Sequence, residues 1–158
     1  MSQKFCIAAQ AVALPLKEAV QAHLEELGYE VVDLVPAEEQ PTISFTGVAQ
    51  YVAKAVQAGE YVKGFVFCGT GMGVSMVANK YHGVRAALVE SLFTAKMSRI
   101  VNNANVLCLG QWVHTPQVAN AIVDEFVGHE FLEDETEPTS TRRTRLEGGI
   151  ALLDEIGE

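Results

Sequence analysis

Short apolar runs alternate with amphipathic segments along most of the chain. The runs typical of buried strands lie at residues 5–9, 30–34, 65–67, 84–89 and 106–109. Helical spacing of apolar residues predicts helices over residues 14–27, from 45 to 58, from the glycine turn to 82, from 91 to about 102, and over 116–126. This alternation predicts a Rossmann-like doubly wound α/β domain, with a five-stranded parallel sheet between two helical layers.

The pattern divides the chain into a domain at residues 1–128 and a C-terminal extension at residues 129–158. The extension is acidic over residues 130–137, is then punctuated by Pro138, and carries Arg142, Arg143 and Arg145 before a helical pattern over residues 146–156. Because the sheet is already complete, we expect the apolar side of this last helix to pack on a partner subunit. Its apolar positions are Leu146, Ile150, Leu153 and Ile156.

The chain is organised around residues 65–80, FVFCGTGMGVSMVANK. A buried strand leads through Cys68 into a glycine turn and then into a helix, an arrangement that presents backbone N–H groups to an anion. Cys68 follows the strand at the edge where open α/β sheets place ligands. A glycine turn of this kind can also be purely structural. Neither GxGxxG nor GxxxxGK[ST] occurs here, so the turn does not favour a nucleotide.

Composition narrows the classes of function. Eleven basic residues against twenty acidic ones give a net charge of −9, which disfavours nucleic-acid and anionic-membrane partners but allows a few arginines to hold a small anion. The three cysteines lack C-x-x-C spacing, which argues against a disulfide framework and a zinc site. We read no signal peptide or membrane segment and expect a cytoplasmic protein without cofactor or metal.

Three segments carry a resemblance to a known family. CGTGMGVSMVANK at residues 68–80, GVRAALVESLFTAKMSR at 83–99 and NNANVLCLG at 102–110 resemble the ribose-5-phosphate isomerase type B and galactose-6-phosphate isomerase family. The likeness runs from about residue 4 to about residue 128. It implies a Rossmann-like homodimer or higher oligomer that interconverts aldose and ketose phosphates through an enediolate, with each active site completed by a partner subunit.

The resemblance also implies roles for individual residues. Cys68 matches the base that takes the proton next to the carbonyl, and Thr70 with the loop amides would hold the enediolate oxygens. Asn102 matches an asparagine that binds sugar hydroxyls. The loop residues implied in substrate binding are Gly69, Gly71, Met72 and Gly73, and the tail arginines implied in phosphate binding are Arg145 and, less directly, Arg142.

The chain departs from the ribose-5-phosphate pattern at three places. Gln10-Ala11 stands where the ribose enzymes carry Asp-His, Val101 replaces the ring-opening histidine, and Phe45 replaces a tyrosine. Ring opening by that histidine is therefore not expected, and one phosphate or ring contact is missing. Of the remaining histidines, we expect His23 and His129 in solvent, and His114 lies after the fifth strand at the ligand edge.

These departures leave several functions open. The substrate is a pentose, hexose or tetrose phosphate; a tetrose 4-phosphate is already open-chain, because its ring-closing oxygen carries the phosphate. Alternatively, the chain is one subunit of a hetero-oligomeric galactose-6-phosphate isomerase, with a related partner chain supplying the missing histidine. A non-catalytic sugar-phosphate binder is the rival from another class, and a nicotinamide-linked oxidoreductase is a more distant one. Cys6 and Cys108 lie in strand patterns and are expected in the core.

Overall fold

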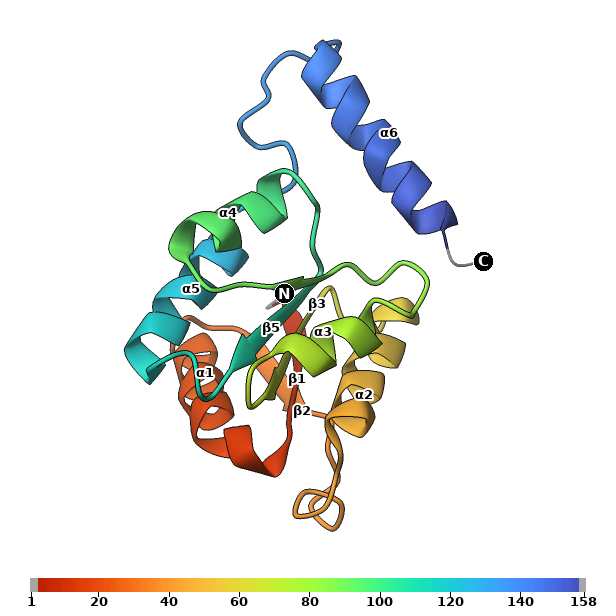
Figure 1. Ribbon diagram of the computed structural model, residues 1–158. Helices are drawn as coiled ribbons and strands as arrows, with labels where there is room; N and C mark the ends of the chain where they lie inside the picture. The colour runs from red at the N-terminus through yellow and green to blue at the C-terminus, as the bar shows by residue number, and fades with distance from the viewer. Residues whose placement is uncertain (1–2, 157–158) are drawn as a thin grey trace.

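The computed structural model describes residues 3–156 and contains one five-stranded parallel sheet in the order β2-β1-β3-β5-β4. The strands are β1 (Lys4–Ala9), β2 (Glu30–Asp33), β3 (Lys63–Cys68), β4 (Ala86–Leu88) and β5 (Val106–Gly110). The helices are the short 3-10 helix η1 (Ala11–Ala13), α1 (Leu14–Glu26), α2 (Phe45–Gln57), α3 (Met72–Ala78), α4 (Leu92–Ile100), α5 (Pro116–Gly128) and α6 (Thr141–Glu155). Figure 1 shows this arrangement, and it confirms the predicted fold class.

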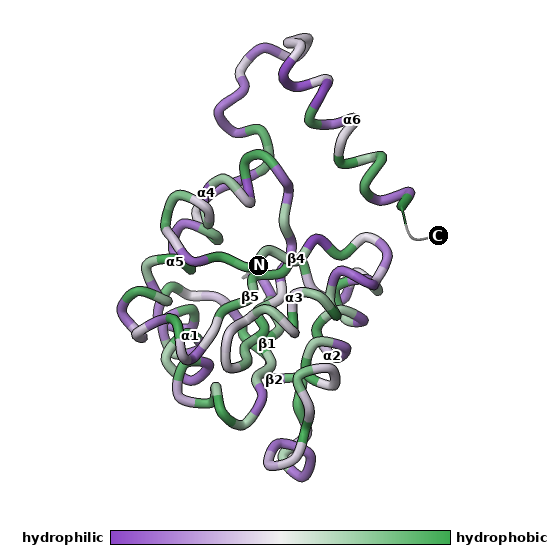
Figure 2. The backbone as a smooth tube through the Cα atoms, viewed as in Figure 1, coloured by the Kyte–Doolittle hydropathy of each residue, from purple (hydrophilic) through white to green (hydrophobic). Residues whose placement is uncertain are grey.

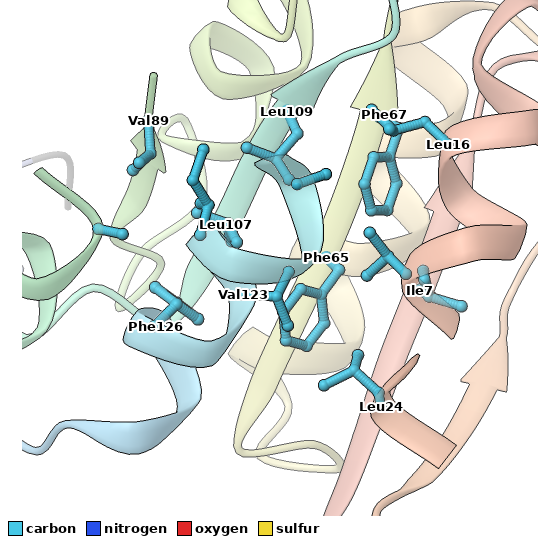
Figure 3. Packing of buried hydrophobic residues seen from close by; sticks show 14 of the residues in the cluster. Ile7, Leu16, Leu24, Phe65, Phe67, Val89, Leu107, Leu109, Val123 and Phe126 are labelled. Carbon is cyan, nitrogen blue, oxygen red and sulfur yellow. The ribbon is translucent and has the colours of Figure 1, made fainter. Parts of the chain in front are cut away.

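Helices cover both faces of the sheet. Successive strand residues point to opposite faces, so Phe65 and Phe67 of β3 enter one core cluster with residues of α1, α4 and α5, as Figure 3 shows in part. Val66 and Cys68 enter the other cluster, with α2 and α3. In Figure 2 the strands are largely hydrophobic, and polar segments gather in the outer turns and tail. None of the described helices is long and apolar enough to cross a membrane.

Several element bounds differ from the expectation, among them the end of α3, which lies at Ala78 rather than at residue 82. Helix α6 begins at Thr141 rather than at residue 146, because the Ser140 side chain accepts a hydrogen bond from the Arg143 N–H at 3.0 Å and caps the earlier start. Helix α4 ends at Ile100, short of residue 102, and Asn103 then turns into the left-handed region at φ 48°. Strand β4 has three residues rather than six, and it pairs only with β5.

Helix α6 stands apart from the rest of the molecule in Figure 1. None of its described side chains is buried, and Leu152 and Leu153 are 59% and 48% exposed. An ion pair joins Asp154 of this helix to Arg85 of the domain at 2.8 Å. The expected packing of this helix on a partner subunit stays a prediction.

The tail is anchored to the domain by a carboxylate shared between two buried cations. Lys63, at the start of β3, and Arg99, in α4, are each only 4% exposed. Glu130 accepts from Lys63 Nζ at 3.2 Å and from Arg99 Nη2 at 2.8 Å. Burial lowers the pKa of both cations, and the Glu130 carboxylate opposes that change. Glu130 therefore partly offsets the desolvation of two positive charges.

Glu130→Gln removes this shared counter-charge and is expected to lower the free energy of unfolding. Because the Glu130 side chain is 63% exposed and screened by water, we expect a loss of about 1 to 2 kcal/mol, less than for a fully buried pair. Urea unfolding measures the loss. Glu137→Gln, which removes an exposed tail carboxylate, serves as the control, and equal stability of the two variants would contradict the anchoring role.

Candidate active site

The glycine loop, residues 69–73 after β3, lies where the connections from two neighbouring strands leave toward opposite faces of the sheet. Strands β1 and β3 are neighbours, and they lead into α1 and α3 on opposite faces of the sheet. At the carboxyl end of β1, the Gln10 N–H donates to the Phe67 carbonyl at 3.0 Å. A crevice between diverging connections is where open α/β sheets bind ligands. The fold therefore places Cys68 and the loop that follows it at the edge of the sheet where such folds bind ligands.

Cys68 is bonded into the loop through its sulfur. Gly71 adopts a left-handed conformation with φ 80°, and its N–H donates to Cys68 Sγ at 3.1 Å. A hydrogen bond from a backbone N–H stabilises negative charge on sulfur. Cys68 is 5% exposed, so the sulfur is largely shielded from water while the residue remains at the end of its strand.

The other two thiols are core residues, as predicted. Cys6 and Cys108 are fully buried on the sheet face shared with α2 and α3. Burial raises the pKa of Cys6 to about 12 and raises the pKa of Cys108 as well. Both therefore stay protonated near neutral pH, as expected for cysteines in the core.

Thr70 places a hydroxyl group in the same loop that donates to the Cys68 sulfur. Its Oγ1 accepts a hydrogen bond from the Met72 N–H at 3.3 Å. The Gly71 N–H, expected to face substrate oxygens, bonds within the loop instead, and so does the Met72 N–H. The hydroxyl hydrogen of Thr70 can then donate to a ligand.

The loop packs closely against β5, and Gly110 makes this approach possible. A Cβ at Gly110 would lie 2.6 Å from the carbonyl carbon of Thr70, closer than side-chain atoms ordinarily approach backbone. Gly71 is similarly close to β5, because a Cβ there would lie 3.0 Å from the carbonyl carbon of Leu109. The position of Thr70 and Gly71 therefore depends on glycine at residue 110.

Gly110→Ala is expected to lower the free energy of unfolding by about 3 kcal/mol, because the added methyl group meets backbone that cannot move without shifting the loop. It should also reduce activity by displacing Thr70. The matched control is Gly128→Ala, where an added Cβ meets nothing within 4 Å. Urea unfolding of both variants tests this, and a Gly110 variant as stable as the control would contradict the close packing.

Asn102 and the tail arginines lie away from Cys68 within one chain. Asn102 lines a cavity of about 260 Å³ with Arg85, Ala86 and Leu153, at the amino end of β4. Because β4 runs parallel to β3, this is the edge opposite Cys68. The structure therefore does not bring Asn102 together with the glycine loop inside a single subunit.

The two candidate phosphate arginines differ in their surroundings. Arg142 pairs with Asp134 at 2.9 Å and with Glu135 at 3.5 Å, and its hydrogen bond lowers the pKa of Asp134. Arg145 is exposed on α6. Since α6 is tied to the domain at Arg85, immediately before β4, both arginines belong to the tail beyond the amino edge of the sheet.

Three histidines bond to partners outside the glycine loop. His114 is 7% exposed, and its Nε2 lies 3.1 Å from the Val89 carbonyl, so it fixes the turn after β5. We expected His23 and His129 in solvent, and this expectation is wrong because both rings pair with carboxylates. Helices α1 and α5 pack together, so His23 of α1 reaches Asp124 of α5 at 2.6 Å. His129 lies between two carboxylates, Glu125 at the end of α5 and Glu133 in the turn that follows.

The sequence analysis did not single out Trp112, which packs against the glycine loop. Its backbone N–H donates to the Gly69 carbonyl at 2.9 Å, and a Cβ at Gly69 would lie 2.6 Å from Trp112 Cζ3. The signal available in the sequence was its place, two residues beyond Gly110 at the ligand edge of β5. Phe45, noted only as a departure, contacts the other end of the loop at Gly73.

Known proteins are similar to this chain in sequence and in fold. Residues 5–145 match the family described as Ribose/Galactose Isomerase. A probable ribose-5-phosphate isomerase B of Mycoplasma pneumoniae is 40% identical over 131 residues, 83% of this chain and 86% of the relative. A D-erythrulose-4-phosphate isomerase of Pectobacterium atrosepticum is 35% identical over 127 residues, 79% and 82% of the two chains. The ribose-5-phosphate isomerase B of Mycoplasma genitalium, solved with ribulose-5-phosphate, superposes with TM-score 0.83 and 35% identity over 98% of this chain and 99% of that one.

Proposed function

The chain belongs to the ribose/galactose isomerase family of sugar-phosphate isomerases, and we propose that Cys68 is the base through which it interconverts an aldose and a ketose phosphate. One observation carries this proposal: the Gly71 N–H donates to Cys68 Sγ at 3.1 Å, at the carboxyl end of a central strand. A sulfur held by an N–H donor is suited to carry the negative charge that a base requires.

The proposed reaction moves hydrogen within the substrate. In the aldose-to-ketose direction, the Cys68 thiolate takes the proton from C2, and the electrons of the broken C–H bond form an enediolate. The Thr70 hydroxyl donates a hydrogen bond to an enediolate oxygen. Cys68 then returns a proton to C1, and the hydroxyl hydrogen of O2 ends on O1. C2 is oxidised and C1 is reduced, so the balance requires no external oxidant or reductant.

A second subunit completes the site in this proposal. The substrate phosphate requires cations, and the candidate arginines lie on a tail that leads away from the glycine loop of its own chain. Exposed Arg145 and the exposed apolar side chains of α6, such as Leu152, support docking of this helix on a second copy. The same docking would bring Asn102 of one copy toward the loop of the other.

We propose a tetrose 4-phosphate and its ketose as the substrate pair. The phosphate occupies the oxygen that would close a furanose ring, so no acid or base is needed to open it. This agrees with Val101, which has no titratable group, and with the engagement of His23, His114 and His129 in other contacts. It also agrees with a relative named as a D-erythrulose-4-phosphate isomerase.

The test is a panel of substrates given to the purified chain alone. We expect conversion of erythrose 4-phosphate and erythrulose 4-phosphate, and a kcat/KM for ribose 5-phosphate, which is mostly cyclic, at least about 100-fold lower. Equal rates with ribose 5-phosphate would refute the four-carbon assignment but leave the isomerase in place. No conversion of four-, five- or six-carbon phosphates would refute the proposal for the homomeric protein, and activity restored by a related chain would identify a hetero-oligomeric subunit.

A further inference from the structure

Two aromatic rings contact opposite ends of the glycine loop. At one end, three ring atoms of Trp112 lie within 2.8 Å of the position that a Gly69 Cβ would take. At the other end, Phe45 Cδ2 lies 2.8 Å from the position of a Gly73 Cβ. The two rings come from separate segments, the turn after β5 and the first residue of α2. Thr70 follows Gly69 in the sequence, and Cys68 directly precedes that glycine.

The backbone segments that carry the two rings are fixed by hydrogen bonds. The backbone N–H of Trp112 donates to the Gly69 carbonyl, and the backbone N–H of Gln111 donates to the Cys68 carbonyl at 3.0 Å. The Gln111 side chain accepts from the Leu16 N–H at 2.9 Å, which ties the same turn to α1. On the other side, Ser44 caps the helix that Phe45 begins. The positions from which the two rings extend are therefore set by the fold.

Both rings are also exposed, unlike the aromatic residues of the core. Trp112 is 72% and Phe45 is 41% exposed, whereas Phe65 is fully buried. Gly69 and Gly73 leave room for the rings at loop positions where any side chain would displace them. Each ring thus packs against the loop and keeps part of its surface accessible.

We infer that Trp112 and Phe45 are specificity-determining residues that limit the carbon chain of the substrate between two apolar walls. The inference rests on the proposed function and explains how a four-carbon chain is selected over a longer one. A fixed wall discriminates by the space that it denies to an additional carbon with its hydroxyl group. The walls act on chain length, independently of whether the sugar can form a ring.

Chain length is tested with two ketoses that are both open-chain, erythrulose 4-phosphate and ribulose 5-phosphate. Trp112→Ala and Phe45→Ala should each lower the ratio of kcat/KM for the four-carbon over the five-carbon ketose by about tenfold. Trp112→Phe, which keeps a ring, should retain most of the preference. Phe93→Ala removes another exposed ring, 71% exposed at the start of α4, and should leave the ratio unchanged. Unchanged ratios in active Trp112 and Phe45 variants would overturn the inference.

Trp112 is the single tryptophan among 158 residues, which gives a second readout independent of turnover. In the Cys68→Ala protein, erythronate 4-phosphate should change the tryptophan emission saturably, and ribonate 5-phosphate should bind at least about tenfold more weakly. Equal affinity for both acids, or calorimetric binding of the four-carbon acid without any change in emission, would overturn the inference. Because this titration needs no catalysis, its result is separate from failure of the isomerase proposal, which the substrate panel reports.

Discussion

Cys68→Ala lowers kcat for erythrulose 4-phosphate by about 10³-fold, within the range that a positioned general base contributes. The variant loses the sulfur that would accept the proton, and no other thiol takes its place, since Cys6 and Cys108 are fully buried. The fold should survive, because the change removes one small atom and one N–H to sulfur hydrogen bond. We expect a loss of about 1 to 2 kcal/mol in the free energy of unfolding.

The matched control for this result is Cys108→Ala on the neighbouring strand β5. Cys108 has no exposed surface, so its replacement should cost stability through the cavity and leave kcat within about twofold. Steady-state rates and urea unfolding of both variants separate the two effects. A Cys68→Ala protein that keeps a tenth or more of the activity would remove Cys68 from the mechanism.

Arg145→Ala is expected to lower kcat/KM by about 10- to 100-fold, mainly through KM, because a charge-assisted hydrogen bond to the phosphate is lost. Arg143 supplies the control two residues away. Its guanidinium bonds the Glu135 carbonyl at 2.7 Å and Glu147 at 3.2 Å inside the tail. Arg143→Ala should therefore change tail stability more than KM. An Arg145→Ala protein with unchanged KM would contradict the assignment of the phosphate to this side chain.

Complementation tests whether Arg145 acts across a subunit boundary. Suppose that the cysteine and the arginine of each site come from different chains. A mixed dimer of Cys68→Ala and Arg145→Ala chains then has one site with both defects and one site with neither. Random co-refolding should then recover about a quarter of the wild-type activity, since half of the dimers carry one intact site. Mixtures no more active than the separate variants would show that each site uses its own tail.

Local periodicity predicted most of the fold. The apolar runs of β1, β3 and β5 are unambiguous because these strands are buried on both faces, and helix α5 follows its spacing from Pro116 onward. The predicted strand β4 was too long, because an apolar run does not show where pairing on an edge strand stops. The early start of α6 depends on the Ser140 cap, a signal that polar tail composition obscured.

The site was predictable only in part. Cys68 could be singled out because the carboxyl edge of a central strand is a defined place in this fold. The contacts of Trp112 with Gly69 and of Phe45 with Gly73 join segments distant in sequence, so no local pattern indicated them. The separation of Arg145 from the glycine loop follows from the path of the tail, which sequence spacing does not determine.

The most direct test of the central claim is exchange of substrate hydrogen with solvent. Wild-type protein incubated with erythrulose 4-phosphate in deuterated water should introduce deuterium at the carbon next to the carbonyl, as followed by NMR, together with the aldose product. Cys68→Ala should slow this exchange by about 10³-fold. Exchange by Cys68→Ala at the wild-type rate would contradict the account, because another group would then be the base.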